Sequence, residues 1–313
     1  MRGAALSGGA KRGSSVGTAL MEGPNCPTVP ISFARIMNTS VERNPQAAQM
    51  ADESMLRTLR FQIEAIWPQE SRLFARYALP VDAHILDVGC GTGEATLRLA
   101  AMFPGAGLVC GVDVMPELLA VAQHQPPPIA GRMPVFEQGD GYALRFADAS
   151  FDLVVCRHVT QLLPEPERLL AELRRVLKPG GWLHVLSEDY GMLHFPTRNG
   201  VDPDRLWHEA VVPFTQSTGT DARIGRSTLP ILRGLGFTHT SVQYLTIDTE
   251  RVPREHLAGI FTAWRDGYVE ALAAAGRLSR TEVRAMFDAI IDTVSDPQAY
   301  GVWHVPVVAG RCP

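Results

Sequence analysis

The sequence predicts an α/β protein with a mostly parallel sheet and helices on both faces. Three observations support this prediction. Residues 83–187 alternate between short apolar segments of strand length and segments with helical periodicity. A loop with three glycines joins the first apolar segment to the next helix, and an acidic residue, Asp113, ends the second apolar segment. Strands that alternate with helices in this way form parallel sheets, because each crossover packs its helix on a sheet face.

The first predicted strand, residues 84–88, leads into Gly89, Gly91 and Gly93 and then into an apolar-periodic helix. Glycine is favoured where the backbone turns tightly or lies against a ligand, because it has no Cβ atom. The N-terminus of the following helix offers free N–H groups and the positive end of the helix dipole. The pattern therefore indicates a ligand site where the first strand meets its helix.

The later core strands also end in polar residues. Asp113 follows the second strand, where an acidic side chain can bind both hydroxyls of a ribose. Ligands of open α/β sheets bind at the carboxyl ends of the strands, so these side chains are expected to share one rim. The five core strands are expected over residues 84–88, 108–112, a segment ending at 139–141, then 151–156 and 182–186.

In this order and spacing, residues 83–187 closely resemble the class I S-adenosylmethionine-dependent methyltransferases. The likeness is strongest to the small-molecule branch that includes the ubiquinone and menaquinone biosynthesis methyltransferases. It implies a Rossmann-like, seven-stranded sheet whose sixth and seventh strands form an antiparallel hairpin at one edge. The matching segments are residues 240–247 and 300–309, with a predicted helical insertion over residues 253–286 between them. Such an insertion between strands 6 and 7 is the sort of element that forms a lid.

A nicotinamide-dependent dehydrogenase is the alternative fold, because it also has a glycine loop after its first strand. The glycines here alternate, whereas the dinucleotide fingerprint places its last two glycines three residues apart. The Asp87 carboxylate just before the loop suits the ammonium group of S-adenosylmethionine and would repel a pyrophosphate. The methyltransferase fold is therefore favoured.

The composition of the 313-residue chain, 46% hydrophobic and 20% charged, is that of an ordinary globular protein. The formal net charge of -4 gives no basic footprint, so no nucleic-acid partner is expected. No apolar run is long enough to form a membrane span. The five cysteines lie far apart without a C-x-x-C pair, which predicts a reduced, cytoplasmic protein without a metal site.

The chain is expected to contain a poorly ordered extension and one domain. Residues 1–48 are rich in small and polar residues without a sustained period, which predicts disorder or an overlong assigned start. The methyltransferase domain is expected over residues 49–313. Within it, residues 49–79 should form one or two helices broken at Pro68, and residues 189–220 should be irregular. Together with the helical insertion, these segments are expected to form the acceptor pocket.

The resemblance also implies roles for individual residues. Asp87 should bind the ammonium group of the cofactor, Asp113 its ribose, and Arg157 its methionine end. Asp140 should accept from the adenine amino group, although a Gly-Asp-Gly sequence also favours a turn. Unpaired carboxylates at strand ends cost stability, which disfavours a purely structural role for Asp87 and Asp113. The residues expected to bind the cofactor are Asp87, Gly89, Gly91, Gly93, Asp113, Val114, Met115, Asp140, Gly141, Tyr142 and Arg157.

His158 and Glu188 are the candidate catalytic residues, because each follows a strand at the predicted rim. A base is needed only when the methyl acceptor arrives protonated. The alternatives are a structural, hydrogen-bonded histidine and a helix-capping glutamate. Roughly two of six aromatic residues are expected to touch the acceptor in an apolar pocket. These aromatic residues are Trp67, Tyr190, Phe195, Trp207, Trp264 and Tyr268.

The predicted function is S-adenosylmethionine-dependent methyl transfer to an N or O atom of a small, partly apolar metabolite. An RNA or protein methyltransferase is one alternative, but it would call for a basic face or an added recognition domain. A protein that uses the fold for a non-transferase role, such as cyclisation, decarboxylation or regulation, is the other. The acceptor, the methylated atom and the oligomeric state are not encoded in a transferable motif.

Overall fold

The computed structural model describes residues 45–46 and 53–313, so the predicted disorder of residues 1–48 lies almost wholly outside the described residues. Residues 45–46 themselves form a turn in which Gln46 is buried. Within the described part of the chain, eight strands form one central sheet. They are β1 (His84–Val88), β2 (Leu108–Asp113), β3 (Val135–Gln138), β4 (Phe151–Arg157), β5 (Leu177–Leu186), β6 (Leu193–His194), β7 (Thr238–Asp248) and β8 (Val302–Arg311).

The strand order is β3-β2-β1-β4-β5-β8, with β7 and the short β6 both paired to β8. Strands β1 to β5 are parallel, and β8 runs antiparallel to β5 and to β7. The predicted parallel core with an antiparallel edge hairpin is therefore confirmed. The two-residue β6 adds one strand to the seven that the sequence predicts, and it pairs with Val302 and Trp303 at the start of β8.

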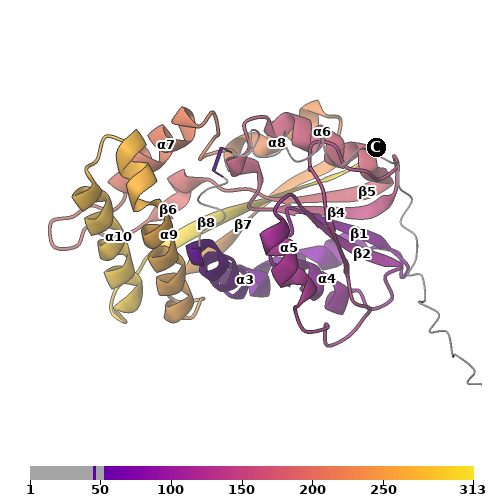
Figure 1. The fold of residues 1–313 in the computed structure, drawn as a ribbon, viewed down its shortest axis with the longest axis horizontal. Coiled ribbons are helices and arrows are strands. Elements are labelled where there is room, and N and C mark those ends of the chain that lie inside the picture. Colours follow the sequence, from indigo (N-terminus) through magenta and orange to yellow (C-terminus); the bar gives the residue numbers. More distant parts are fainter. Residues whose placement is uncertain (1–44, 47–52) are drawn as a thin grey trace, which may run out of the picture.

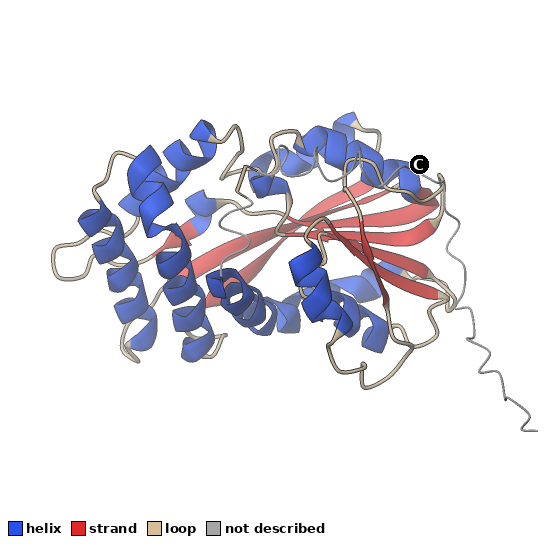
Figure 2. Cartoon of the chain, in the orientation of Figure 1, coloured by secondary structure: helices blue, strands red, loops and turns tan. Residues whose placement is uncertain are grey.

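Helices cover both faces of the sheet (Figures 1 and 2). Alternate residues of a strand point to opposite faces. Thus Ile85 of β1 packs in one apolar cluster with Leu99, whereas Leu86 packs in another with Leu170. The first face carries α3 (Glu53–Phe74), α4 (Glu94–Met102) and α5 (Pro116–Gln123), and the second carries α6 (Pro166–Val176) and α8 (Gly225–Gly234).

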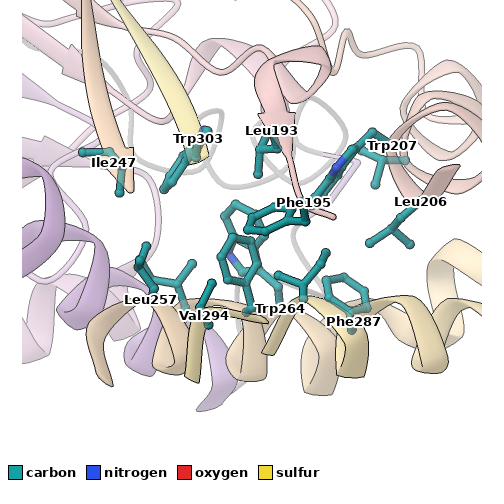
Figure 3. Packing of buried hydrophobic residues seen from close by; sticks show 14 of the residues in the cluster. Leu193, Phe195, Leu206, Trp207, Ile247, Leu257, Trp264, Phe287, Val294 and Trp303 are labelled. Carbon is teal, nitrogen blue, oxygen red and sulfur yellow. The ribbon is translucent and has the colours of Figure 1, made fainter. Parts of the chain in front are cut away.

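A helical cap covers the end of the sheet where β6 begins (Figure 1). Trp264, Phe287 and Trp303 belong to its large apolar core, part of which Figure 3 shows. The cap therefore packs against the antiparallel hairpin of β7 and β8. The helical insertion, which lies between these two strands in the sequence, forms part of the cap. The cap consists of η4 (Trp207–Val211, a π-helix), α7 (Val212–Ser217), α9 (Arg254–Ala275) and α10 (Arg280–Ser295).

Short 3-10 turns in other described parts of the chain are η1 (Ala75–Tyr77), η2 (Thr160–Leu162) and η3 (Tyr190–Met192).

Two predictions were wrong: the end of the helical insertion and the helix break at Pro68. The helical insertion does not end near residue 286, because α10 continues to Ser295. Ser279 caps α10 and forms a reciprocal capping box with Glu282, which begins a second helix after α9. Pro68 does not break α3. Proline has no N–H, so the backbone carbonyl of Glu64 lacks its helical hydrogen bond. Glu64 and Pro68 both lie on the exposed side of α3, where water can donate to this carbonyl.

The segment 189–220, expected to be irregular, contains β6, η4 and α7. Its aromatic residues are the reason, because they pack into the cap core and fix the backbone there. The indole of Trp207 stacks on Tyr190 with ring centroids 5.9 Å apart. Tertiary packing of this kind overrides the weak local periodicity.

Candidate active site

The glycine loop between β1 and α4 has a left-handed backbone at all three alternating glycines. The φ angles are 73° at Gly89, 53° at Gly91 and 79° at Gly93. Other residues adopt such angles only at a cost. A Cβ atom added to Gly89 would also lie 2.3 Å from a side-chain carbon of Val159. The alternating spacing therefore follows from the backbone path itself.

Asp113 at the end of β2 holds this loop in place. Its Oδ2 accepts a hydrogen bond from the Gly91 N–H at 2.8 Å, and its Oδ1 accepts one from the Met115 N–H at 2.9 Å. Burial raises the pKa of this carboxyl, and the two backbone donors partly offset that effect. Asp113 therefore has backbone partners within the chain, the N–H groups of Gly91, Met115 and Val114. A carboxylate has about four acceptor positions, so it can still accept a hydrogen bond from a ligand.

Asp87 at the end of β1 is 1% exposed and accepts a hydrogen bond from the Thr96 hydroxyl at 2.7 Å. It too has a partner within the chain. Burial raises the pKa of Asp87 to about 6, although the Thr96 hydroxyl and the charge of Arg157 oppose the shift. A cationic group of a ligand that bound beside Asp87 would stabilise the charged form of this carboxyl group.

Two cavities lie beside the loop, and a third adjoins both of them. The loop cavity encloses about 840 Å³ of empty space, part of it open to solvent, and is lined by every predicted cofactor residue except Asp87 and Gly93. Asp87 lines a smaller cavity of about 380 Å³, the Asp87 cavity, together with Glu94 and Arg157. Glu94 has a buried carboxylate oxygen without a partner and a pKa raised by burial, and the sequence analysis assigned it no role.

The third cavity, the aromatic pocket, encloses about 730 Å³ of empty space, part of it open to solvent. Most of its lining comes from α3, from the segment 189–220 and from the helical insertion, the segments expected to enclose the acceptor, and the rest comes from Gln46, His158, Gln161 and Leu162. The aromatic residues Trp67 and Phe195 pack in the core instead. The pocket is lined by four of the predicted aromatic residues, Tyr190, Trp207, Trp264 and Tyr268.

His158 and Glu188 form a hydrogen-bonded pair at the rim. The His158 Nδ1 lies 2.6 Å from Oε1 of the buried Glu188. Because a carboxylate only accepts, Nδ1 carries the hydrogen, and Nε2 of the neutral ring keeps its lone pair. That Nε2 is buried without a partner. The backbone of His158 is left-handed, with φ of 55°, at a cost on the order of 1 kcal/mol that active sites often bear.

Arg157, the residue before His158, is held by a buried carboxylate. Its guanidinium binds Glu70 of α3, with Nη2 2.8 Å from Oε2. His184 of β5 lies 3.1 Å from the other oxygen of Glu70 and 2.7 Å from the Tyr77 hydroxyl. Burial favours the neutral form of Glu70, but Arg157 and His184 outweigh it and lower its pKa to about 2. Arg157 lines both the loop cavity and the Asp87 cavity, so this network fixes a cation beside the predicted cofactor residues.

His158 and Leu59 line all three cavities and so stand where the cavities meet. Neither Leu59 nor Gln161 of the aromatic pocket is among the site residues predicted from the sequence. Among residues 45–46 and 53–313, no three histidine, cysteine, aspartate or glutamate side chains gather into a group that could hold a metal ion. None of the described helices is long and apolar enough to cross a membrane.

The strand order, the left-handed glycine loop and the acidic residues at the ends of β1 and β2 agree with the resemblance to the class I S-adenosylmethionine-dependent methyltransferases. Residues 86–185 match the family described as a methyltransferase domain. The chain carries that domain, in agreement with the resemblance read from the sequence.

Curated relatives share this part of the chain. A trans-aconitate 2-methyltransferase of Methylobacterium nodulans is 37% identical over 140 residues, which cover 45% of this chain and 51% of the relative. A demethylmenaquinone methyltransferase of Lactiplantibacillus plantarum is 37% identical over 115 residues, 36% of this chain and 48% of the relative. The chain thus spans about half the length of the curated relatives it matches.

A solved structure shares the fold over most of the chain. The phosphoethanolamine N-methyltransferase 2 of Haemonchus contortus, in complex with S-adenosyl-L-methionine, matches with a TM-score of 0.54. The identity is 17%, and the match covers 91% of this chain and 60% of the other. At this identity the likeness concerns the fold alone.

Proposed function

We propose that this protein transfers a methyl group from S-adenosylmethionine to an N or O atom of a small, partly apolar metabolite. The observation that carries the proposal is the position of His158, which lines the loop cavity, the Asp87 cavity and the aromatic pocket at once. A cofactor in the first two cavities and an acceptor in the third would meet at this residue.

The residues of the two loop-side cavities fit S-adenosylmethionine. Asp87, buried and with a raised pKa, suits its ammonium group, and Arg157 suits its carboxylate. Asp113 keeps acceptor capacity for the ribose, and Asp140 lines the same cavity for the adenine. When bound, the cofactor supplies a methyl group already activated by a sulfonium.

The chain's own task is then to position the acceptor, exclude water and, where the acceptor is protonated, take its proton. The apolar walls of the aromatic pocket serve the first two tasks. The unpartnered Nε2 of His158 serves the third, because the buried Glu188 carboxylate can stabilise the imidazolium that forms. We therefore propose His158 as the proton acceptor and Glu188 as the residue that positions it.

The two alternatives from the sequence are less well supported. An RNA or protein acceptor would need a broad basic surface, and the described lining of the aromatic pocket contains no lysine or arginine. The curated relatives are named for acceptors as different as trans-aconitate and demethylmenaquinone, so their names do not select one acceptor. A purely regulatory role would leave the His158–Glu188 pair without a proton to transfer.

The proposal is tested by incubating the purified chain with methyl-labelled S-adenosylmethionine and a fractionated cell extract. We expect label in the small-molecule fraction. Label in RNA or protein would contradict the acceptor class, and cofactor binding without any transfer would favour the non-transferase alternative.

Replacing Asp113 with asparagine is expected to weaken cofactor binding about 10- to 100-fold, the cost of about 1–3 kcal/mol for a lost or mispaired polar contact. Asparagine has about the volume of aspartate, but its side-chain NH2 group would face a backbone N–H where a carboxylate oxygen of Asp113 accepts a hydrogen bond. The measurement is the Kd for S-adenosylmethionine by calorimetry. Glu137→Gln is the matched control, because Glu137 on β3 pairs with Arg145 and lines none of the three cavities. Equal affinities in both variants would remove Asp113 from the site.

Cofactor affinity is expected to fall as the pH falls below about 6, because burial raises the pKa of Asp87 to about 6. An ammonium group binds the charged carboxylate, so protonation of Asp87 competes with binding. The Kd should rise toward tenfold per pH unit well below that pKa. The Asp87→Asn variant should bind weakly at every pH and lose this dependence. A wild-type Kd that stays flat between pH 7 and pH 5 would contradict the assignment.

A further inference from the structure

The aromatic pocket combines apolar walls with buried polar atoms that have no partner. Three residues of its lining carry such atoms: Nε2 of His158, Oε1 of Gln161 and Nε1 of Trp207. Gln161 is 5% exposed and Trp207 is 2% exposed, so bulk water does not satisfy these groups. A buried polar group without a partner costs about 1–3 kcal/mol. These atoms are covered in the unliganded pocket, so a ligand that supplied the missing partners, with a small rotation of the side chains, would recover that free energy.

The chemistry of the three atoms specifies the complement. The Trp207 indole N–H can only donate, so it calls for an oxygen that accepts. The Gln161 amide oxygen accepts, and so does the His158 Nε2 while Nδ1 donates to Glu188. The matching ligand therefore presents one oxygen that accepts, such as a carbonyl, and two groups that donate, such as two hydroxyls.

The charge and shape of the pocket narrow the class further. Its described lining includes no lysine, arginine, aspartate or glutamate, and His158 is its one titratable group that can become a cation. A carboxylate desolvated there would find no fixed cation to pair with. The rings of Tyr190 and Trp207 are stacked at 16°, and Trp264 meets Tyr190 at 72°. Flat aromatic walls of this kind favour a planar, ring-sized ligand.

We infer that the acceptor is an uncharged hydroxylated aromatic compound that carries a carbonyl oxygen, and that its hydroxyl oxygen receives the methyl group. This inference rests on the proposed function and narrows its acceptor. Gln161 and Trp207 are then residues that determine specificity, a role that no sequence motif gave them.

The transfer balances with the groups present. A lone pair of the hydroxyl oxygen forms the new O–C bond as the S–C bond breaks, and the electrons of that bond stay on sulfur. The hydroxyl proton passes to Nε2 of His158, and the imidazolium pairs with Glu188 until the proton leaves to solvent. The sulfonium charge is lost as the imidazolium charge appears, so no net charge is created in the pocket.

The test measures binding to the full chain saturated with S-adenosylhomocysteine, so that it does not depend on turnover. The probes are 2,4-dihydroxyacetophenone, the matched acid 2,4-dihydroxybenzoate, 4-ethylresorcinol (which lacks the carbonyl) and trans-aconitate. We expect the ketone to bind at least about tenfold more tightly than either acid, a difference of about 1.4 kcal/mol. We also expect methyl transfer from S-adenosylmethionine to a hydroxyl oxygen of the ketone.

Trp207→Phe removes the indole N–H and keeps an aromatic ring. It should weaken binding of the ketone about tenfold and leave binding of 4-ethylresorcinol nearly unchanged, because only the ketone loses a partner. An equal loss for both probes would mean that Trp207 acts through packing alone and would contradict its role here.

The outcomes separate this inference from the proposed function. Tighter binding of dihydroxybenzoate or trans-aconitate, or binding of none of the neutral hydroxyl probes, would overturn the inferred acceptor class. The proposed function would stand in those cases as long as S-adenosylmethionine binds and label reaches some small molecule. Failure of the chain to bind S-adenosylmethionine would instead overturn the proposed function itself.

Discussion

Replacing His158 with glutamine is expected to lower kcat by about 10²- to 10⁴-fold, the usual contribution of a positioned general base. Glutamine approximates the size of the ring and can still bind Glu188, but it has no nitrogen that takes up a proton. The Kd for S-adenosylmethionine should change far less, because Asp87, Asp113 and the loop remain in place. The measurement is kcat with the identified acceptor together with the Kd of the cofactor.

His194→Gln is the matched control for that variant. His194 also follows the core strands, but its side chain is 60% exposed and contacts Asp204 at the surface. Glu188→Gln should lower kcat as well, since the charge that stabilises the imidazolium is lost, while His158 itself is kept. Unchanged kcat in His158→Gln would make the histidine structural. A large loss in His194→Gln would mean that the effect is not specific to the rim pair.

The loop and the strand ends could be predicted because their signals are local. Each alternating glycine has a left-handed φ, and the backbone path alone demands the residue type. Asp113 directly follows the apolar run of β2, so its place at the rim follows from the strand itself. Short stretches of sequence therefore sufficed for the parallel core and for the cavity beside the loop.

The partners of those residues could not be predicted, because they come from distant segments. Glu70 and Arg157 lie 87 residues apart, and neither their spacing nor their composition marks them as a pair. The aromatic pocket is likewise assembled by tertiary packing of three separate segments, so Trp207 could not be told from a core residue in advance. One signal was available and not used, since Ser279 and Glu282 have the spacing of a capping box and mark the start of α10.

Replacing Glu70 with glutamine is expected to lower the free energy of unfolding by about 3–5 kcal/mol, because it leaves Arg157 charged, largely buried and unpaired. The pair is well enclosed, with the Glu70 side chain fully buried and that of Arg157 10% exposed. His184 would also lose a partner at 3.1 Å. The measurement is urea denaturation at pH 7 without ligand, with the slope checked so that a change in midpoint reports stability.

Glu64→Gln on the same helix is the matched control, because Glu64 also pairs with an arginine, Arg98, but both side chains are well exposed. Exposed pairs of that kind contribute about 0–1 kcal/mol. The difference between the variants should also depend on pH. Because the pKa of Glu70 is lowered to about 2 in the folded protein, its contribution is complete above the ordinary carboxyl range and is lost as the pH falls toward 2. A Glu70→Gln variant that is as stable as Glu64→Gln at pH 7 would show that Arg157 finds another partner. The cation beside the cofactor cavities would then be held by something other than Glu70.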